Sequence, residues 1–217
     1  MKDIAIYGAG GFGREVSCLI KKINEQKQTW NMIGFFDDGI EIGTTNRFGK
    51  ILGGISDLNN WCNDLAIVMA IATPSIIESI VSNLENSNVN FPNIIAPDII
   101  YLDENSFSMG RGNLIMPQSL VSCNVSLGDF NFLNCGVSLG HEVSLGSYNS
   151  MMSYVKISGD VEIGNGNYFG ICSVVLQGRQ IGNHTTIGAN SVIMRNTRDD
   201  TTNFGNPAIE ILKPKMK

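Results

Sequence analysis

Two adjacent residues, His141 and Glu142, carry the clearest candidate chemistry in this sequence. They lie between two copies of Val-Ser-Leu-Gly in the stretch VSLGHEVSLG, residues 137–146. Histidine changes its protonation state near neutral pH and is the side chain most often used as a general base. A neighbouring carboxylate stabilises the imidazolium that forms when such a base takes a proton. The pair predicts a catalytic site if the backbone turns here, because neighbours in a strand point apart.

The other histidine, His184 in IGNHTT, has no acidic neighbour, and we expect it to be a structural residue. Two separated histidines form no ligand cluster, so we expect no metal site. The five cysteines show no C-x-x-C spacing, which argues against a zinc knuckle and against a disulfide framework.

A second candidate site lies near the start of the chain. Gly8, Gly10 and Gly13 follow a short apolar run and fit the pattern G-x-G-x-x-G. Glycines in this position permit a tight turn, and the amides at the following helix start can face a phosphate. Asp37 and Asp38 close the next predicted strand, where a ribose hydroxyl would be met. The pattern favours a nucleotide or sugar-nucleotide pocket, and a plain strand-to-helix turn is the alternative.

Alternating strands and helices must position that glycine turn. The apolar runs at 4–7, 32–36 and 65–72 predict strands, and 91–95 predicts a fourth. Helical spacing follows the glycines through Val16, Leu19, Ile20 and Ile23. Thr73 and Pro74 open a second helix, as its cap and first residue. Residues 1–97 therefore predict a half-Rossmann-like α/β domain, expected to bind a sugar nucleotide.

A six-residue repeat must position His141. Residues 109–198 divide into fifteen hexapeptides without an insertion, and each begins with an apolar residue. Glycine takes the second place in eight of them, and Val, Ser, Thr or Asn takes the fifth place in all but one, where Arg179 stands. This period predicts a parallel β-helix over residues 98–217, with the first and fifth places inward. The second to fourth places should form corners, where glycine and asparagine tolerate a positive φ.

This pattern resembles the left-handed β-helix acyltransferases. Together with the N-terminal GAGGFG and the LGHEVSLG segment, it is similar to the sialic-acid O-acetyltransferase and bacillosamine N-acetyltransferase type, which modifies sugars of bacterial surface glycans. The resemblance covers nearly the whole chain. It implies three hexapeptides to each triangular coil, a homotrimer, acetyl-CoA as the donor, and catalytic roles for His141 and Glu142.

The resemblance also implies the residues that hold the donor. Gly159 takes the place whose backbone amide binds the acetyl oxygen, and Ile171 and Ala189 match positions along the coenzyme channel. Ser150 stands where the bacillosamine enzyme has a second histidine facing the acetyl group, so a hydroxyl would bind there instead. The segment 203–208 resembles the one that closes the C-terminal end of the channel.

The acceptor site is implied in the same way. Residues carried over to it from the resembling enzymes are Gly10, Gly11, Phe12, Asp37, Asp38 and Ala72. Phe12 replaces a polar residue of the relatives, and residues 73–76 lack the basic side chains that would hold a diphosphate. A nucleotide-linked amino sugar is the expected acceptor, while a free sugar acid or a sugar-like metabolite stays open.

Composition excludes several classes of partner. A net charge of −5 and a pI near 5.0 give no basic field for nucleic acid. No apolar run approaches the ~18 residues of a membrane span, so we expect a cytoplasmic protein. Phe130, Phe132, Tyr148 and Tyr154 are expected at corners or outward positions, as an exposed aromatic patch that marks an interface.

Three alternatives to a sugar N-acetyltransferase remain at this stage. The first is an O-acetyltransferase of the same architecture. The second is a nicotinamide-binding redox protein with a β-helix appendage. The third is a trimeric scaffold without catalysis, against which the His141–Glu142 pair argues.

Overall fold

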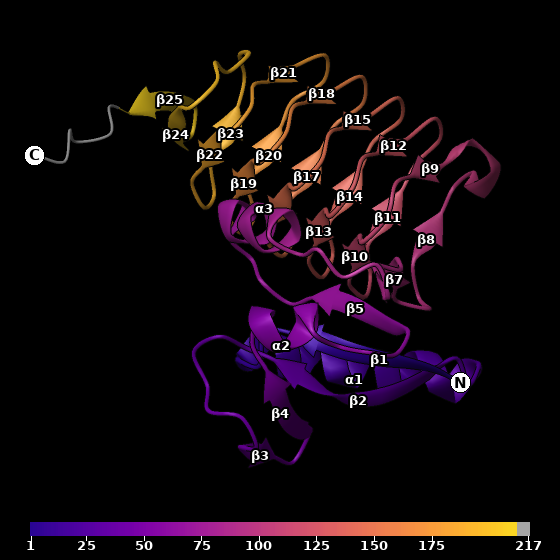
Figure 1. The fold of residues 1–217 in the computed structure, drawn as a ribbon. Helices are drawn as coiled ribbons and strands as arrows, with labels where there is room; N and C mark the ends of the chain where they lie inside the picture. Colours follow the sequence, from indigo (N-terminus) through magenta and orange to yellow (C-terminus); the bar gives the residue numbers. More distant parts are fainter. Residues whose placement is uncertain (212–217) are drawn as a thin grey trace, which may run out of the picture. The chain divides into compact units, whose positions relative to one another are not determined.

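The structure is a computed structural model that describes residues 1–211. The chain separates into two compact units, Met1–Pro97 and Asp98–Lys217. Residues 212–217, which end the second predicted domain, lie outside the described part. Figure 1 labels the helices and strands.

A parallel sheet with helices forms the first unit. Its elements are β1 (Lys2–Tyr7), α1 (Gly11–Gln26), β2 (Trp30–Phe36), β3 (Thr45–Asn46), β4 (Gly49–Gly53), α2 (Ile55–Asn59), β5 (Leu65–Met69), α3 (Pro74–Ser82), β6 (Val89–Asn90) and β7 (Ile94–Ile95). The sheet order is β3-β4-β2-β1-β5-β6; the β3–β4 pair is antiparallel and the other pairs are parallel. The predicted half-Rossmann-like class is confirmed.

Two of the predicted elements need correction. The strand expected at 65–72 ends at Met69, and only one further amide, that of Ala70, bonds to β1, through Tyr7 O. The fourth strand of the sheet is β6, paired with β5, and not 91–95. The α3 helix begins at Pro74 after Thr73 as predicted, although the Thr73 side chain makes no capping hydrogen bond.

Short strands, stacked coil upon coil and parallel except for the last pair, form the second unit (Figure 1). We name its three faces by their strands. The first face holds β10 (Leu114–Ile115), β13 (Phe132–Leu133), β16 (Ser150–Met151), β19 (Tyr168–Phe169), β22 (Thr186–Ile187), β24 (Thr202–Gly205) and β25 (Ala208–Ile211). The second holds β8 (Ile100–Tyr101), β11 (Leu120–Val121), β14 (Ser138–Leu139), β17 (Lys156–Ile157), β20 (Val174–Val175) and β23 (Val192–Ile193). The third holds β9 (Ser108–Met109), β12 (Ser126–Leu127), β15 (Ser144–Leu145), β18 (Glu162–Ile163) and β21 (Gln180–Ile181), and a 3₁₀ turn (Glu104–Ser106) precedes β9.

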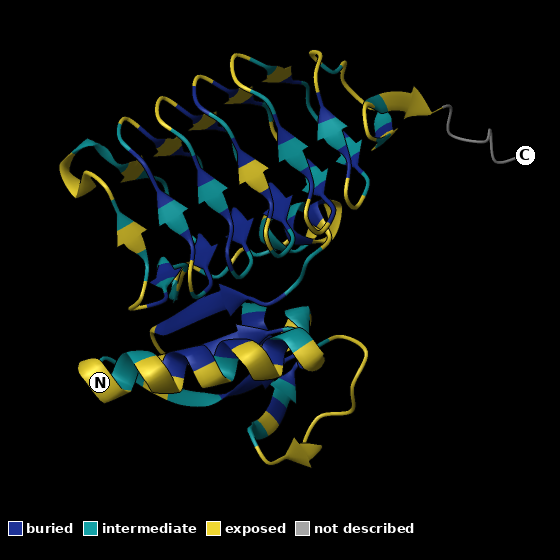
Figure 2. Ribbon diagram, turned by 180° about the vertical axis from the view of Figure 1, so that it is seen from behind, coloured by how far each residue is buried: buried dark blue, intermediate teal, exposed yellow. Residues whose placement is uncertain are grey.

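The inward places of the repeat are those predicted. Every first-place residue from Ile115 to Ile193 is buried, and so is every fifth-place residue from Asn113 to Ser191 except Arg179. Figure 2 shows buried segments that alternate with exposed and partly exposed ones along the coils. The apolar first places pack into the core that holds the coils together, because they leave water on folding. The parallel β-helix is confirmed.

The corners depart from the prediction in their use of glycine. A positive φ occurs at the fourth place of all hexapeptides but the last, at every sixth residue from Gly112 to Asn190. The second-place glycines serve another purpose, because the next coil passes too close for a side chain. A Cβ on Gly140, for example, would lie 2.6 Å from the Gly159 nitrogen, and one on Gly170 would lie 2.5 Å from the Ala189 nitrogen.

The predicted aromatic patch is largely wrong. Phe130 and Phe132 are only 2% and 3% exposed. Tyr148 stacks on Phe130 with ring centroids 5.3 Å apart, because both occupy the fourth place at one corner in successive coils. Of the four residues, only Tyr154 is largely exposed, at 51%.

Three edges run along the β-helix where the faces meet. The Ile171 edge joins the first and second faces, and its third-place residues include Ile171 and Ala189. The His141 edge joins the second and third faces, and its third-place residues are Cys123, His141, Gly159, Gln177 and Arg195. The asparagine edge joins the third face back to the first, and buried Asn113, Asn131, Asn149 and Asn167 occupy its fifth places.

Candidate active site

His141 and Glu142 lie side by side at a corner between β14 and β15. His141 Nδ1 is 2.7 Å from Glu142 Oε2, and the two side chains are 47% and 57% exposed. The fourth-place φ of +58° at Glu142 brings the carboxylate to the same side as the imidazole. The corner that the pairing requires is therefore present.

The pairing fixes which imidazole nitrogen can act as a base. An ionised carboxylate only accepts hydrogen bonds, so Nδ1–H donates the hydrogen bond to Glu142 and keeps its proton. Nε2 is then the nitrogen with a lone pair that can take a proton from another molecule.

Gly159 lies one coil beyond His141 on the same edge, directly against the imidazole. A Cβ built on Gly159 would collide with His141 Nε2, so only glycine leaves space at this nitrogen. The Gly159 residue is buried, and its backbone N–H has no acceptor among the described residues. A donor without an acceptor among the described residues therefore lies beside the candidate base.

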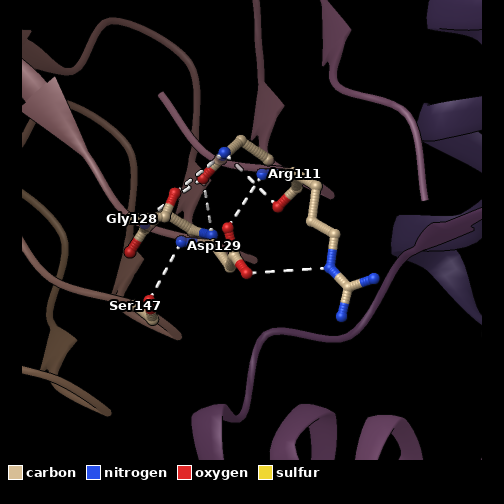
Figure 3. A network of polar contacts seen from close by, with 6 residues as sticks. Arg111, Gly128, Asp129 and Ser147 are labelled. Carbon is tan, nitrogen blue, oxygen red and sulfur yellow. Dashed lines mark hydrogen bonds and ion pairs between the residues drawn. The ribbon is translucent and has the colours of Figure 1, made fainter. Parts of the chain in front are cut away.

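On the asparagine edge, by contrast, the corresponding third-place amides have side-chain acceptors (Figure 3). The Arg111 amide donates to Asp129 Oδ1 at 2.9 Å, and the Asp129 amide donates to Ser147 Oγ at 2.9 Å. The Ser147 amide continues the series to Asn165. Third-place side chains with an oxygen thus satisfy the third-place amides of this edge. One coil beyond Ile171 is Ala189, which has no such oxygen, and one coil beyond Gly159 is Gln177, whose side chain makes no hydrogen bond to the Gly159 amide. The described residues supply the amides of Gly159, Ile171 and Ala189 with no acceptor.

Ile171 and Ala189 share a groove on the Ile171 edge. The groove has a volume of about 440 Å³, and its lining includes Tyr168, Gly170 and Gly188. Ile171 is 47% exposed. Because the Ile171 edge and the His141 edge lie on opposite sides of the second face, one chain does not bring these residues to His141.

Ser150 does not line this groove. It lies on β16 between Phe132 and Tyr168 of the neighbouring strands and is 0% exposed. Its hydroxyl has no hydrogen-bond partner in the described chain. A ligand contact at Ser150 would require a rearrangement of the first face.

Two glycines of the N-terminal motif have no room for a side chain within the fold, whereas the third has open space around it. Gly8 has φ +105°, and a Cβ there would lie 2.7 Å from Ala70 O. A Cβ on Gly13 would collide with Gly8 O, which is the close helix-to-strand approach expected of the third glycine. Around Gly10, no atom lies within 4 Å of the Cβ position. The start of α1 is therefore open at Gly10, and no side chain of the described residues caps it at this position.

Asp37 and Asp38 are already engaged within the unit. Asp37 accepts from the Ala9 amide at 2.8 Å and from the Gly39 amide at 2.9 Å. Asp38 accepts from the Tyr7 hydroxyl at 2.5 Å and from the Ile55 amide at 2.8 Å. The two carboxylates thus hold the glycine turn and the start of α2.

Burial raises the pKa of Tyr7, and the hydrogen bond to Asp38 raises it further. Tyr7 therefore stays neutral and remains a donor to that carboxylate. Both aspartates also border a shallow groove of about 450 Å³ with residues 39–42 and 54–57.

The remaining predicted acceptor residues lie around the open start of α1 or beyond β5. Gly11 and Phe12 are in the first turn of α1, with Phe12 partly buried, and Ala72 is partly exposed three residues after β5 ends. Sequence reasoning missed Arg14, whose Nη2 lies 3.8 Å from the Cβ position at Gly11. A basic residue four positions after Gly10 was the available signal.

His184 occupies the fourth place on the asparagine edge, away from the His141 edge. Its amide donates to Asn165 O at 2.8 Å. No group of three or more potential metal-ligating side chains occurs among residues 1–211. Within the same residues, no helix has the length and apolar character needed to cross a membrane.

The chain is similar to known proteins in sequence and in fold. Residues 3–84 match the family described as the PglD N-terminal domain. A search of curated proteins finds no match. The structure of WeeI from Acinetobacter baumannii AYE is similar over 97% of this chain and 100% of that chain, with a TM-score of 0.86 and 28% identity.

A second similar structure is the acetyltransferase domain of PglB from Neisseria gonorrhoeae FA1090 in complex with acetyl coenzyme A. It has a TM-score of 0.87 and 26% identity over 97% of this chain and 99% of that chain. The chain is a hexapeptide-repeat acetyltransferase. Its β-helix is of the left-handed type, as the resemblance implied.

The fold of this acetyltransferase extends to more distant proteins. A mutant of perosamine N-acetyltransferase from Caulobacter crescentus, in complex with CoA and GDP-perosamine, has a TM-score of 0.83. The two sequences are 19% identical, with 98% of each chain covered, so this likeness concerns the fold.

Proposed function

We propose that the protein transfers the acetyl group of acetyl-CoA to the amino group of a nucleotide-linked sugar, with His141 as the general base. The observation that carries this proposal is the geometry around His141. Its Nδ1 is held by Glu142 at 2.7 Å, and its Nε2 lies against Gly159, whose backbone N–H has no acceptor among the described residues.

Each residue of this site has a chemical role. His141 Nε2 takes the proton from the acceptor amine as its nitrogen attacks the acetyl carbonyl, and it returns the proton to the departing thiolate. Glu142 stabilises the imidazolium in between. The Gly159 N–H donates to the acetyl oxygen as negative charge develops there, which is the role of an oxyanion-hole donor.

A homotrimer would complete the site. The His141 edge and the Ile171 edge border the same second face. If three copies of this face meet around a three-fold axis, the His141 edge of each chain lies beside the Ile171 edge of the next. The third-place amides of Gly159 and Ala189 would then line one channel for the coenzyme. The acetyl-CoA complex of the PglB domain supports a donor of this kind.

The first unit supplies the acceptor site in this proposal. The open start of α1 at Gly10 presents backbone amides to a phosphate, and the Arg14 guanidinium lies beside them. Asp37 and Asp38 border a groove, where the remaining lone pairs of their carboxylates can accept hydrogen bonds from a nucleotide base or a ribose hydroxyl. Uridine diphosphate is the nucleotide that the resemblance implies.

We also place the enzyme in the cytoplasm. No disulfide joins its five cysteines, all of which lie within residues 1–211, and this fits a reducing compartment. Acetyl-CoA and sugar nucleotides are then available to it together.

The test is acetyl transfer followed by thiol release, with amino sugars and matched hydroxyl sugars on uridine diphosphate as acceptors. We expect turnover with the amino sugar, and the His141→Asn variant to lower kcat by ~10² to 10⁴. His184→Asn, on another edge, is the matched control and should retain full activity.

Three results would redirect the proposal. Faster turnover of the hydroxyl acceptor indicates an O-acetyltransferase. Near-normal turnover by His141→Asn removes this histidine from the mechanism. Saturable NADH binding without acetyl transfer indicates the redox alternative.

A further inference from the structure

Arg179 breaks the inward fifth-place pattern of the preceding coils. Val125, Val143 and Val161 occupy the same place in the preceding coils and are buried. The Arg179 side chain instead remains at the His141 edge. Its Nε donates to Gln177 O at 3.1 Å and its Nη1 to Met194 O at 3.5 Å. Two backbone carbonyls therefore hold a guanidinium on the edge that carries His141.

Arg195 places a second guanidinium on this edge. It occupies the third place three coils beyond His141, through β17, β20 and β23, and it is exposed. Neither Arg179 nor Arg195 forms an ion pair with a carboxylate of the described residues, whereas nearby Arg198 pairs with Glu210 at 2.9 Å. Arg195 lines a groove of about 570 Å³ with Asn196 and Thr197.

The charge of the His141 edge changes sign along its length. Glu142 and, one coil further, Asp160 occupy fourth places near His141. Arg179 and Arg195 follow in the next two coils. A ligand that extends along this edge from His141 would therefore meet carboxylates first and two guanidinium groups at the far end.

The distance from His141 to Arg195 matches the length of coenzyme A between its thioester sulfur and its first phosphorus. Stacked strands are ~4.8 Å apart, so three coils separate His141 from Arg195 by roughly 14 Å. Thirteen bonds join the thioester sulfur of coenzyme A to its first phosphorus. An extended chain advances about 1.15 Å per bond, which gives roughly 15 Å.

We propose that Arg179 and Arg195 bind the 5′-diphosphate of the coenzyme. The proposal rests on the proposed function, since it requires acetyl-CoA at His141. Guanidinium groups suit this role because their planar N–H donors match phosphate oxygens in pairs and keep their charge at all physiological pH values. Holding the diphosphate would fix the pantetheine arm along the edge, with its thioester at His141 and Gly159.

The test measures binding by calorimetry, without turnover, for CoA, 3′-dephospho-CoA and pantetheine. We expect Arg195→Gln to weaken the binding of CoA and of 3′-dephospho-CoA equally, by about tenfold or more, because both ligands carry the diphosphate. Binding of pantetheine, which has no phosphate, should be unchanged. Arg179→Val should behave in the same way, and it should fold because valine fills this place in three other coils.

Arg111→Gln is the matched control, since it removes the same charge on the asparagine edge near the start of the β-helix. It should leave all three affinities unchanged. Equal affinities of Arg195→Gln and the unchanged protein for CoA would overturn the inference. A loss confined to CoA would assign the arginine to the 3′-phosphate instead, and would equally overturn it. If the unchanged protein binds no CoA, the proposed function itself fails.

Discussion

At the scale of single residues, the space beside His141 Nε2 depends on the absence of a side chain at Gly159. A methyl group there would displace the imidazole. Misplacing a catalytic group by ~1 Å can cost about 100-fold in rate. We therefore expect Gly159→Ala to lower kcat by roughly 100-fold, measured by thiol release, with an unchanged unfolding temperature. Full activity in this variant would show that the imidazole acts from another position.

Two serines in one inward column provide a test of stability. Ser173 is fully buried and its hydroxyl has no partner in the described chain, whereas Ser191 Oγ accepts from the Gly205 amide at 3.0 Å. An unsatisfied buried hydroxyl costs stability, and so does removing a satisfied one. We expect Ser173→Ala to raise the free energy of unfolding by about 1 kcal/mol and Ser191→Ala to lower it by about 1 kcal/mol, measured by denaturant titration. Equal effects of the two substitutions would contradict this assignment.

Sequence reasoning reached some site residues and missed the orientation of others. The adjacency of His141 and Glu142 is evident from the sequence. Their contact depends on the positive φ of Glu142, which the presence of a glutamate does not predict. Gly159 was placed by resemblance, and the structure adds its physical reason. Ser150 illustrates the opposite case, because its burial depends on packing that the repeat alone does not encode.

At the scale of elements, the buried asparagine ladder stabilises one edge. Asn149 Oδ1 accepts from both the backbone and the side chain of Asn167, at 3.0 and 2.9 Å. Removing it leaves two buried donors without an acceptor. We expect Asn149→Ala to lower the free energy of unfolding by about 2 to 4 kcal/mol, measured by the denaturant midpoint. Asn165→Ala, exposed on the same edge, is the control, and a loss as large as that of Asn149→Ala would refute the role of burial.

The period of the sequence predicted the elements of the β-helix better than those of the first unit. A hexapeptide assigns each inward place by number, so one register fixes all coils. In the first unit, two-residue strands such as β3 and β6 are too short for a hydrophobic pattern, and neither was predicted. The fourth-place aromatics were misjudged because Phe130 and Tyr148 cover each other rather than facing solvent.

At the scale of the whole molecule, assembly should depend on the second face. Val174 and Val192 lie on this face in a partly exposed position, while Ser126 and Ser144 lie exposed on the third face. We expect Val174→Asp to convert a trimer to monomers in sedimentation, with parallel loss of activity, because a charge would be buried at the interface. Ser144→Asp should remain trimeric and active. A fully active monomer would rule out a site shared between chains.

The contrast between the edges has a consequence for how such a site can arise. On the asparagine edge, the side chain of an aspartate, serine or asparagine at the third place accepts a hydrogen bond from the third-place amide of the coil before it. At His141 and Ile171, where Gly159 and Ala189 stand one coil further on, no side-chain oxygen accepts from the third-place amide. The capacity to bind a ligand through backbone amides is therefore created where a third-place side chain has no oxygen. The single substitution Asn165→Gly would leave the Ser147 amide without its acceptor. A few such substitutions in successive coils would move the row of available amides to another edge without altering the core.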